Sequence, residues 1–379
     1  KPSSAAWDVY KRQIMFSVFK PYIFSLDPEV AHDLAIQSLK FNFLPKSLFY
    51  VDNEELLETD LFNEKIPNPI GLAAGFDKSA EVYNSLFKLG YGFVEVGTIT
   101  PKKQLGNPKP RVFRLEKDQA LINRLGFNNH GSEIVSKRIA NDLPSGFLGI
   151  NIGPNKDTLH KEDDFYICLS KLSSFAGYIT INISSPNTEG LRNFHDQTQL
   201  EKLLRGIKNK NVTKPIAIKI SPDIKESEIS KIIELIIKYK IQGIIVSNTT
   251  DNNRDKLSDI KRSEKGGLSG QPLKDISTSL VKKFYGETKG KVEIIGVGGV
   301  DSGQSAFEKI AAGASAIQLY TGMVYKGPGI VKDIKKDLIS ILKKEKLKKI
   351  DDAIGINAWP ISQLQLYSFR KNLCLKDAN

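Results

Sequence analysis

From about residue 66 onward, the sequence alternates short apolar runs with amphipathic segments of helical spacing. Short apolar runs bounded by turn residues predict buried parallel strands, here at residues 69–74, 93–97, 147–152, 178–183, 215–220, 243–246, 292–297 and 316–319. The segments between them predict helices at 80–89, 133–140, 164–172, 200–208, 227–239, 273–284, 305–312 and 330–343. Eight strands that are each followed by a helix favour an α/β fold, the (β/α)8 TIM barrel, which needs about 250 residues.

A doubly wound parallel sheet is the alternative architecture for the same alternation. Its dinucleotide-binding form carries a G-x-G-x-x-G turn after the first strand, whereas residues 71–75 read Gly-Leu-Ala-Ala-Gly. The later glycines at 296, 298 and 299 lack a third glycine at the right offset. The sequence therefore favours the closed barrel.

Polar residues follow all of the predicted strands. The fourth strand runs into Asn182, Ser185 and Asn187, and Pro186 ends it because proline has no N–H for a strand ladder. The other strands lead into 75–78, Thr98, Asn151, Lys219 with Ser221, 247–250, 298–299 and 320–322. The active site of such a barrel lies at the carboxyl ends of its strands. A single asparagine there is often only a turn residue, but a whole ring of amides and hydroxyls indicates a site for a small, polar, planar ligand.

Gly298 and Gly299 follow the seventh strand, and Tyr320, Thr321 and Gly322 follow the eighth. These are the usual phosphate-binding positions of the barrel, and glycine lets backbone N–H groups approach a phosphate closely. Plain tight turns are the alternative interpretation. A Walker lysine signature is absent from the sequence, which favours the phosphate of a bound cofactor over that of a hydrolysed nucleotide.

Lys219 lies inside an apolar strand, where a charge is costly to bury without a partner. Three interpretations are open. The lysine could face the barrel mouth and favour the anionic reduced form of a flavin. It could be paired with a buried carboxylate, or it could be the Schiff-base lysine of an aldolase.

Residues 14–50 differ from the rest, because aromatic and aliphatic side chains gather there around Asp27-Pro28, a helix start signal. The pattern predicts two short amphipathic helices. They are suited either to lying on a bilayer surface or to covering one side of the barrel. The sequence contains no run of eighteen apolar residues, so no membrane-spanning helix is expected.

The formal net charge of +12 comes mainly from lysine. A nucleic-acid-binding protein would more often cluster arginine with aromatic residues, so no nucleic-acid partner is expected. The two cysteines and four histidines are scattered, which predicts neither a disulfide nor a metal site and favours a reducing compartment.

Eight longer sequence segments are specific in their order and spacing. They are residues 71–78, 96–101, 110–115, 122–128, 149–153, 182–188, 266–270 and 295–299. Together they make residues 15–345 resemble the second, quinone-dependent class of dihydroorotate dehydrogenases. The first class has a similar barrel but a cysteine base and no amino-terminal helices, whereas this chain has Ser185 and residues 14–50 at the matching places. A fumarate- or NAD-linked activity is disfavoured for the same reason and because no iron–sulfur cysteine set exists. A flavin-binding scaffold without catalysis stays open as a different class of answer.

The resemblance implies an FMN enzyme that oxidises dihydroorotate to orotate in pyrimidine biosynthesis and reduces a quinone. Ser185 would be the base that takes the C5 proton. The residues implied for the substrate are Lys78, Asn123, Arg124, Leu125, Gly126, Phe127, Asn182, Asn187, Asn248 and Thr249. Those implied for FMN are Ala74, Gly75, Lys78, Thr98, Asn151, Asn182, Lys219, Ser247, Gly270, Gly299, Tyr320 and Thr321. Residues 188–196 could form a lid over the site.

The resemblance also implies that the helices of residues 14–50 form an apolar tunnel for quinone, with His32 and Arg114 at its inner end. The resemblance further implies that residues 51–345 form the FMN-binding catalytic barrel. We expect the protein to be a monomer that binds peripherally to the cytoplasmic face of a bacterial inner membrane, or alternatively to a mitochondrial inner membrane. Residues 1–13 and most of 346–379, from about 357 onward, match nothing in the family, and no function is assigned to them.

Overall fold

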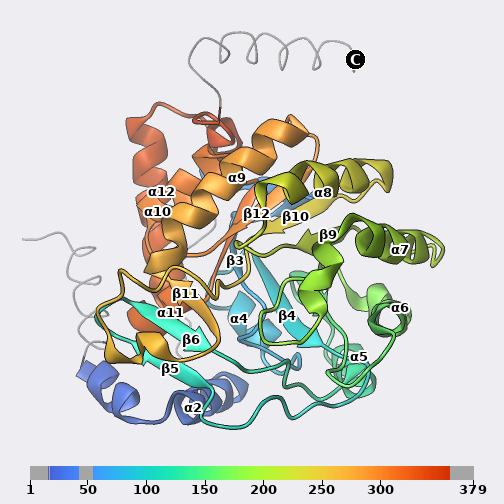
Figure 1. Ribbon diagram of the computed structural model, residues 1–379. Helices are drawn as coiled ribbons and strands as arrows, with labels where there is room; N and C mark the ends of the chain where they lie inside the picture. The colour runs from blue at the N-terminus through green and yellow to red at the C-terminus, as the bar shows by residue number, and fades with distance from the viewer. Residues whose placement is uncertain (1–15, 17, 42–53, 359–379) are drawn as a thin grey trace, which may run out of the picture.

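The computed structural model describes residue 16 and residues 18–41 and 54–358. Eight parallel strands close into a barrel at the centre of these residues (Figure 1). In barrel order they are β3 (Ile70–Leu72), β4 (Phe93–Ile99), β7 (Phe147–Ile152), β8 (Tyr178–Asn182), β9 (Ile216–Lys219), β10 (Gly243–Val246), β12 (Glu293–Val297) and β13 (Ala316–Leu319). β13 pairs with β3, which closes the cylinder. The predicted TIM barrel and all eight predicted strands are confirmed.

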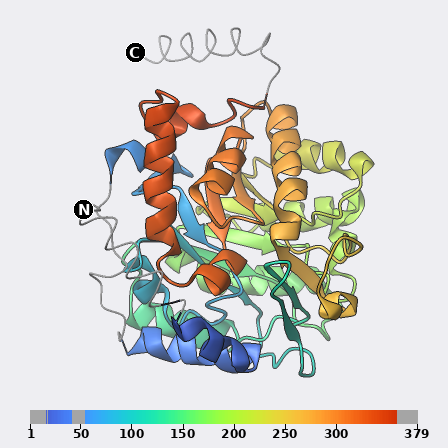
Figure 2. The same cartoon turned by 90° about the vertical axis from the view of Figure 1, so that its left-hand side faces the viewer.

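Helices surround the barrel (Figures 1 and 2). They are α4 (Tyr83–Phe87), α5 (Ser132–Asn141), α6 (Lys161–Leu172), α7 (Gln197–Lys208), α8 (Glu226–Lys238), α9 (Lys274–Thr288), α10 (Gly303–Ala311), α11 (Thr321–Lys326) and α12 (Ile330–Lys344). The first predicted helix, at 80–89, is shorter than expected. Its start is replaced by a turn in which the Asp77 carboxylate accepts hydrogen bonds from the backbone N–H groups of Glu81 and Val82, at 2.7 and 2.8 Å.

The amino-terminal end of the barrel is closed by a hairpin of β1 (Thr59–Leu61) and β2 (Glu64–Ile66). Leu61, Phe62 and Ile66 are buried there and pack in one cluster with Phe93 and Tyr178 from the barrel strands. Burial of these side chains removes apolar surface from water and seals this end. The carboxyl ends of the strands therefore provide the open end of the cylinder.

A second, antiparallel sheet of three strands lies near that open end. Its order is β11 (Gly267–Gly270), β6 (Ala120–Asn123) and β5 (Val112–Leu115). The apolar side chains of Leu115, Ala120, Ile122, Leu257 and Leu268 form its own small core. The sequence analysis did not predict these strands, and they contribute walls to the cavity described below.

The amino-terminal segment is helical at residues 18–25 and in α2 (Pro28–Lys40). Asp27 caps α2 by accepting from the N–H groups of Glu29 and Val30, as its start signal predicts. Both helices lie at one edge of the molecule (Figure 2), and α2 lies beside β5 (Figure 1). Part of predicted segment 14–50, at 14–15, 17 and 42–50, lies outside the described residues.

Two arginines, one just before β5 and one on it, attach this segment to the small antiparallel sheet. Arg111 makes a bidentate ion pair with Glu29 of α2, with Nη2–Oε1 and Nε–Oε2 distances of 2.9 and 3.1 Å. Arg114 of β5 donates to the carbonyls of Phe24 and Leu26 at 3.1 and 2.8 Å. Among the described residues, every helix is too short or too polar to cross a membrane.

Candidate active site

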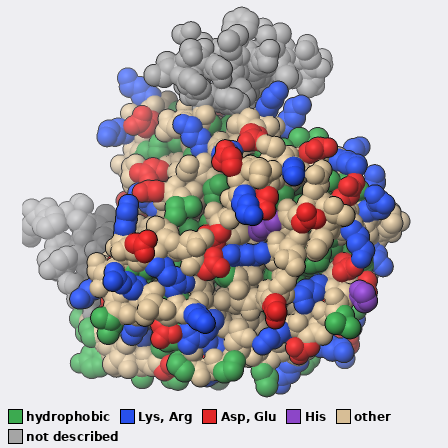
Figure 3. Space-filling view, in the orientation of Figure 1, with side chains coloured by type: hydrophobic (Ala, Val, Ile, Leu, Met, Phe, Trp, Pro, Cys, Tyr) green, Lys and Arg blue, Asp and Glu red, His purple; other side chains and the backbone are tan. Residues whose placement is uncertain are grey.

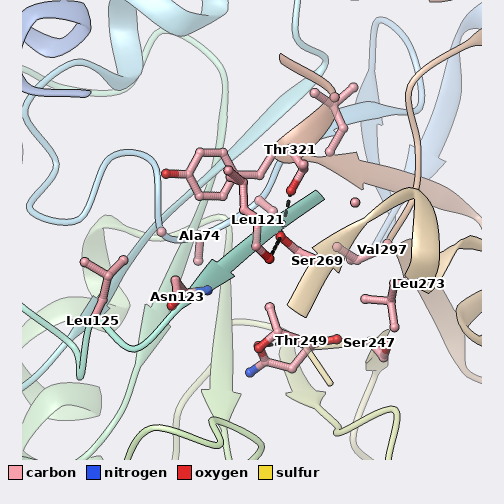
Figure 4. Close-up of a pocket in the computed structure, with 18 of the residues that line it drawn as sticks. Ala74, Leu121, Asn123, Leu125, Ser247, Thr249, Ser269, Leu273, Val297 and Thr321 are labelled. Carbon is pink, nitrogen blue, oxygen red and sulfur yellow. Dashed lines mark hydrogen bonds between the residues drawn. The ribbon is translucent and has the colours of Figure 1, made fainter. Parts of the chain in front are cut away.

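A cavity opens at the carboxyl ends of the barrel strands, between them and the small antiparallel sheet. Figure 4 shows Asn123 and Thr249 on one side of it, with Ala74 and Leu125 nearby and Val297 and Leu273 on another side. Ala74, Thr249 and Val297 lie at or just after the carboxyl ends of parallel barrel strands, which meet at one rim, whereas Asn123 ends β6 of the small antiparallel sheet. The sequence prediction that polar strand ends converge is thus reproduced in space.

Most of the predicted site residues line this one cavity. They are Ala74, Gly75, Lys78, Thr98, Asn123, Leu125, Gly126, Phe127, Asn182, Ser185, Asn187, Lys219, Ser247, Asn248, Thr249, Gly270, Gly299, Tyr320 and Thr321. Arg124, Asn151, His32 and Arg114 lie outside its lining. Asn151 stands directly behind it, since its Oδ1 accepts a hydrogen bond of 2.7 Å from Thr98.

A network of amides holds the polar side of the cavity. Asn182, at the end of β8, donates through Nδ2 to Thr98 Oγ1 at 3.0 Å. Its Oδ1 accepts from Asn248 Nδ2 at 3.3 Å, and Asn248 also donates to Ser184 Oγ at 2.9 Å. Asn187 donates to the backbone carbonyl of Asn123 at 3.0 Å. These contacts fix several amides around one space, where each can donate and accept toward a planar ring.

Ser185 lies beside these amides and is only 6% exposed. Its Oγ accepts a hydrogen bond of 3.2 Å from the N–H of Asn187, which orients the hydroxyl. A hydroxyl in this position is nearly shielded from water yet lines the cavity. It is therefore placed to exchange a proton with a bound molecule when a ligand closes the site.

Lys219 of β9 enters the cavity from the barrel interior. Its Nζ lies 4.0 Å from Oε1 of Glu95, a buried residue of β4. Burial lowers the pKa of Lys219, and the charge of Glu95 opposes that shift. Two of the three sequence interpretations thus hold together in the geometry: the lysine reaches the cavity and also has a buried carboxylate partner.

The glycine turns after β12 approach their surroundings closely. Gly298 and Gly299 have φ values of +113° and +70°, in the region that favours glycine. A Cβ at Gly299 would stand 2.4 Å from Cβ of Lys274. Ser269 and Thr321, which line the same cavity, share a hydrogen bond of 2.8 Å (Figure 4). Backbone and hydroxyl donors here suit an anionic group such as a phosphate.

Comparison with known proteins agrees with this geometry. Residues 56–342 match the family model described as dihydroorotate dehydrogenase. The chain is 44% identical over 347 residues to the quinone-dependent dihydroorotate dehydrogenase of Bradyrhizobium diazoefficiens, covering 89% of this chain and 94% of that one.

The chain belongs to the dihydroorotate dehydrogenase family. A mitochondrial quinone-dependent relative from Mus musculus is 43% identical, with 88% of this chain and 87% of the relative covered. A solved dihydroorotate dehydrogenase from Eimeria tenella, in complex with ferulenol, superimposes with a TM-score of 0.84 at 38% identity, covering 88% of this chain and 96% of that one. The family predicted from the sequence segments is therefore confirmed, and quinone-dependent members of this family are among the relatives.

Lys78 connects this family's barrel to the amino-terminal helices. Its Nζ lies 3.0 Å from Nε2 of His32 on α2. Burial and, to a lesser extent, the charge of Lys78 lower the pKa of His32 to about 3, and burial lowers that of Lys78 to about 8. At neutral pH the ammonium of Lys78 therefore donates to a neutral imidazole.

Aromatic rings continue this connection. The His32 ring meets Phe76 edge-on at 5.1 Å between centroids, and Phe76 meets Tyr320 at 6.0 Å. Tyr320 lines the cavity, so the ring series runs from α2 to the site. Arg114, the other tunnel candidate, stacks on Phe24 at 4.7 Å and holds the first helix rather than lining the cavity.

The side chain of Arg124, which the resemblance implies for the substrate, makes its contacts outside the cavity lining. Its guanidinium pairs with Glu264 at 2.7 Å and donates to the carbonyls of Pro110 and Lys265. These contacts join the loops that precede β5 and β11, which lie at the same end of the small sheet. The substrate role that the resemblance implies for Arg124 therefore stays a prediction.

The predicted lid segment contains the short helix η3 (Leu191–His195). Arg192 in it pairs with Asp223 at 3.0 Å and with Asp251 at 2.8 Å, which follow β9 and β10. It also donates to the carbonyl of Ser184, next to Ser185, at 3.4 Å. The segment is thus clamped to the loops beside the amide network.

Some lining residues were not predicted. Val112, Gln119, Leu121 and Ser269 come from the small antiparallel sheet and its turn. Glu95, which lies behind the lining, was not predicted either. A glutamate inside the apolar run 93–97 could have indicated it, because a buried carboxylate must have partners.

Proposed function

We propose that this chain oxidises (S)-dihydroorotate to orotate with FMN as cofactor and a quinone as final electron acceptor, in pyrimidine biosynthesis. The observation that carries the proposal is the convergence of Ser185, the asparagine amides and Lys219 on one cavity. The family membership and the quinone-dependent relatives support it.

The residues present suit FMN. The turn of Gly298 and Gly299 and the hydroxyls of Ser269 and Thr321 would hold its phosphate, and Lys219 would face the flavin's pyrimidine edge. The further cofactor residues are Ala74, Gly75, Lys78, Thr98, Asn151, Asn182, Ser247, Gly270 and Tyr320. The chemistry that FMN supplies when bound is acceptance of a hydride from C6 of dihydroorotate at N5, and later release of two electrons to the quinone.

The protein's own part in the first step is to orient the substrate and take a proton. Asn123, Asn182, Asn187 and Asn248, with Thr249, would bind the carbonyl and N–H groups of the pyrimidine ring, and Lys78 would bind its carboxylate. Ser185 would take the C5 proton. Serine is a weak base, so the reaction needs the water exclusion that its burial and the segment clamped by Arg192 provide.

The amino-terminal helices would be the quinone's route to the flavin. They expose Val18, Phe19, Tyr22, Leu26, Val30, Leu34 and Phe41. Hydrophobic side chains gather along the lower edge of Figure 3, where α2 lies in Figure 1. An exposed apolar face on short helices is typical of proteins that lie on a bilayer surface.

We propose peripheral association with an inner membrane on this face, the cytoplasmic face in a bacterium or a mitochondrial inner membrane otherwise. The relatives include both a bacterial and a mitochondrial protein. His32, with its contact to Lys78, would stand at the inner end of the quinone route, and the chain would work as a monomer.

Anaerobic spectroscopy tests the proposal directly. The purified protein should carry the visible absorption of oxidised flavin and lose it when dihydroorotate is added. A flavin-binding scaffold would stay coloured, and a lysine-dependent aldolase would be colourless and trapped by borohydride at Lys219. Either of those results would refute the proposed function.

A further inference from the structure

Glu95 is a buried carboxylate in the middle of the barrel, with 0% of its surface exposed. Four donors from three other barrel strands converge on it across the barrel interior. Asn151 of β7 donates to Oε1 at 2.8 Å, while Tyr178 and Thr180 of β8 and Gln318 of β13 donate to Oε2 at 2.8, 3.0 and 3.0 Å. Acceptance of four hydrogen bonds is the pattern of an ionised carboxylate, which can only accept.

The titratable groups that face Glu95 in these contacts are Lys219 of β9 and Tyr178 of β8. Burial raises the pKa of Tyr178 well above its usual value, so its hydroxyl stays a donor. Lys219, with Nζ 4.0 Å from Oε1, is the positive partner. An isolated ammonium in such a place would be strongly disfavoured, and an opposite charge at this distance stabilises it.

The same carboxylate is connected to the amide network. Asn151, which donates to Glu95, accepts from Thr98 at 2.7 Å, and Thr98 accepts from Asn182 at 3.0 Å. Glu95 is therefore connected to the cavity in two ways. One is its ion pair with Lys219, and the other is the series of hydrogen bonds through Asn151 and Thr98 to Asn182. Glu95 itself lies outside the cavity lining.

We propose that Glu95 is a positioning residue that holds Lys219 as a charged ammonium at the cavity and thereby sets the redox balance of the flavin bound there. This inference rests on the proposed function, because it takes the ligand beside Lys219 to be FMN. Glu95 does not touch the flavin. It acts through Lys219, whose positive charge favours the anionic reduced form, and its own negative charge moderates that effect.

Glu95→Gln is the variant that tests the proposal, because it removes the charge and keeps the shape. The hydroxyls of Tyr178 and Thr180 can rotate to accept from the new amide. The buried Oε1 of Gln318, which has no hydrogen-bond partner within the described part of the chain, can do so after an amide flip. The matched control is Thr180→Val, which deletes one hydrogen bond to Glu95 but keeps the carboxylate, its other donors and Lys219.

The measurement is the ratio of reduced to oxidised bound FMN at a fixed potential against a reference dye, from about pH 5 to about pH 9. At the acid end, Glu95→Gln should shift this ratio about tenfold toward reduced flavin, as expected when one unit charge is removed within a protein interior. At higher pH the ratio should fall through a new break where Lys219 loses its proton. Wild type and Thr180→Val should lack this break. If the ratio of reduced to oxidised flavin in Glu95→Gln matches that of wild type at every pH, Glu95 has only a structural role and the proposal is overturned, whether or not the variant is less stable to heat.

Thermal unfolding of apoprotein provides a readout that needs no flavin. If Glu95→Gln destabilises the protein or prevents folding because it strands a buried charge, Glu95→Gln/Lys219→Met should be more stable than Glu95→Gln alone. A double variant no more stable than Glu95→Gln would contradict the proposal. If the wild-type protein does not bind FMN, the proposed function is contradicted. The comparison of the two variants in thermal unfolding would still test whether Glu95 stabilises the charge of Lys219.

Discussion

Lys78 Nζ of the barrel lies 3.0 Å from Nε2 of His32 on helix α2. The barrel residue lines the cavity, whereas the histidine belongs to the amino-terminal helices. The two parts of the molecule are therefore joined at the point where the proposed substrate site and the proposed quinone route would meet. Substrate binding and attachment of the helices should both respond to the protonation of this pair.

The pH dependence of substrate capture should report Lys78. Burial lowers its pKa to about 8, below the usual value of 10.5. Above about pH 8 the ammonium loses its proton and its attraction for the substrate carboxylate. We expect kcat/KM for dihydroorotate to fall there, by up to about tenfold per pH unit, as an essential acid is lost. In Lys78→Arg, whose guanidinium stays charged, the fall should move to higher pH. A wild-type profile that is flat across this range would argue against the role of Lys78.

Acid should weaken the attachment of α2. The folded-state pKa of His32 is about 3, below its ordinary value of 6.5. A base whose pKa is depressed by folding contributes stability above pH 6.5 and loses it as the pH falls toward 3, by up to a few kcal/mol. His32→Gln keeps an acceptor for Lys78 and does not titrate. Thermal scans at about pH 7 and about pH 5 should show a smaller acid loss for His32→Gln than for wild type. Surface variant His160→Gln is the matched control, and equal acid losses in all three proteins would contradict the assignment.

The phosphate turn can be tested with two glycines. Gly299→Ala places a Cβ 2.4 Å from Lys274 Cβ at a φ of +70°, so the turn must move. Gly286→Ala in α9 meets nothing within 4 Å and is the matched control. We expect the first variant to lose at least about tenfold in FMN affinity, the effect of about 1.4 kcal/mol, and the second to match wild type. Fluorescence titration of apoprotein with FMN makes the comparison, and equal affinities would place the phosphate elsewhere.

The apolar face of the amino-terminal helices should bind lipid. Phe19 and Tyr22 are 57% and 72% exposed. Phe19→Ser/Tyr22→Ser should weaken binding to phospholipid vesicles by about tenfold or more, because two large apolar side chains no longer enter the bilayer. Quinone reduction in vesicles should fall, while reduction of a soluble dye should not. Leu159→Ser/Ile260→Ser changes two residues that are 93% and 88% exposed elsewhere and should have no effect. Equal losses in both variants would refute a dedicated membrane face.

The barrel could be predicted because its signal is local and repeated. Each strand is a short apolar run, and each helix has one apolar face, so the alternation is visible without knowledge of long-range contacts. The convergence of strand ends then follows from the topology. This is why Ser185, Lys219 and Gly299, far apart in the chain, could be expected in one cavity before it was seen.

The antiparallel sheet could not be predicted in the same way. β5, β6 and β11 have four residues each, and β11 pairs with β6 across more than 140 residues of sequence, as in the pairing of Gly267 with Asn123. Arg124 illustrates the consequence. The family resemblance implies a substrate contact for it, and that role stays a prediction. The contacts of its side chain with Glu264 and two carbonyls could not be predicted, because only the folded sheet brings these groups near.

The most direct test of the account is anaerobic mixing of dihydroorotate with wild type, Ser185→Ala and the surface control Ser170→Ala. All three should contain flavin. Wild type and Ser170→Ala should lose the visible absorption of oxidised flavin, and Ser185→Ala should do so at least about a hundredfold more slowly, the usual effect of removing a general base. Flavin reduction at a near-normal rate in Ser185→Ala would contradict the central claim that this buried hydroxyl takes the proton.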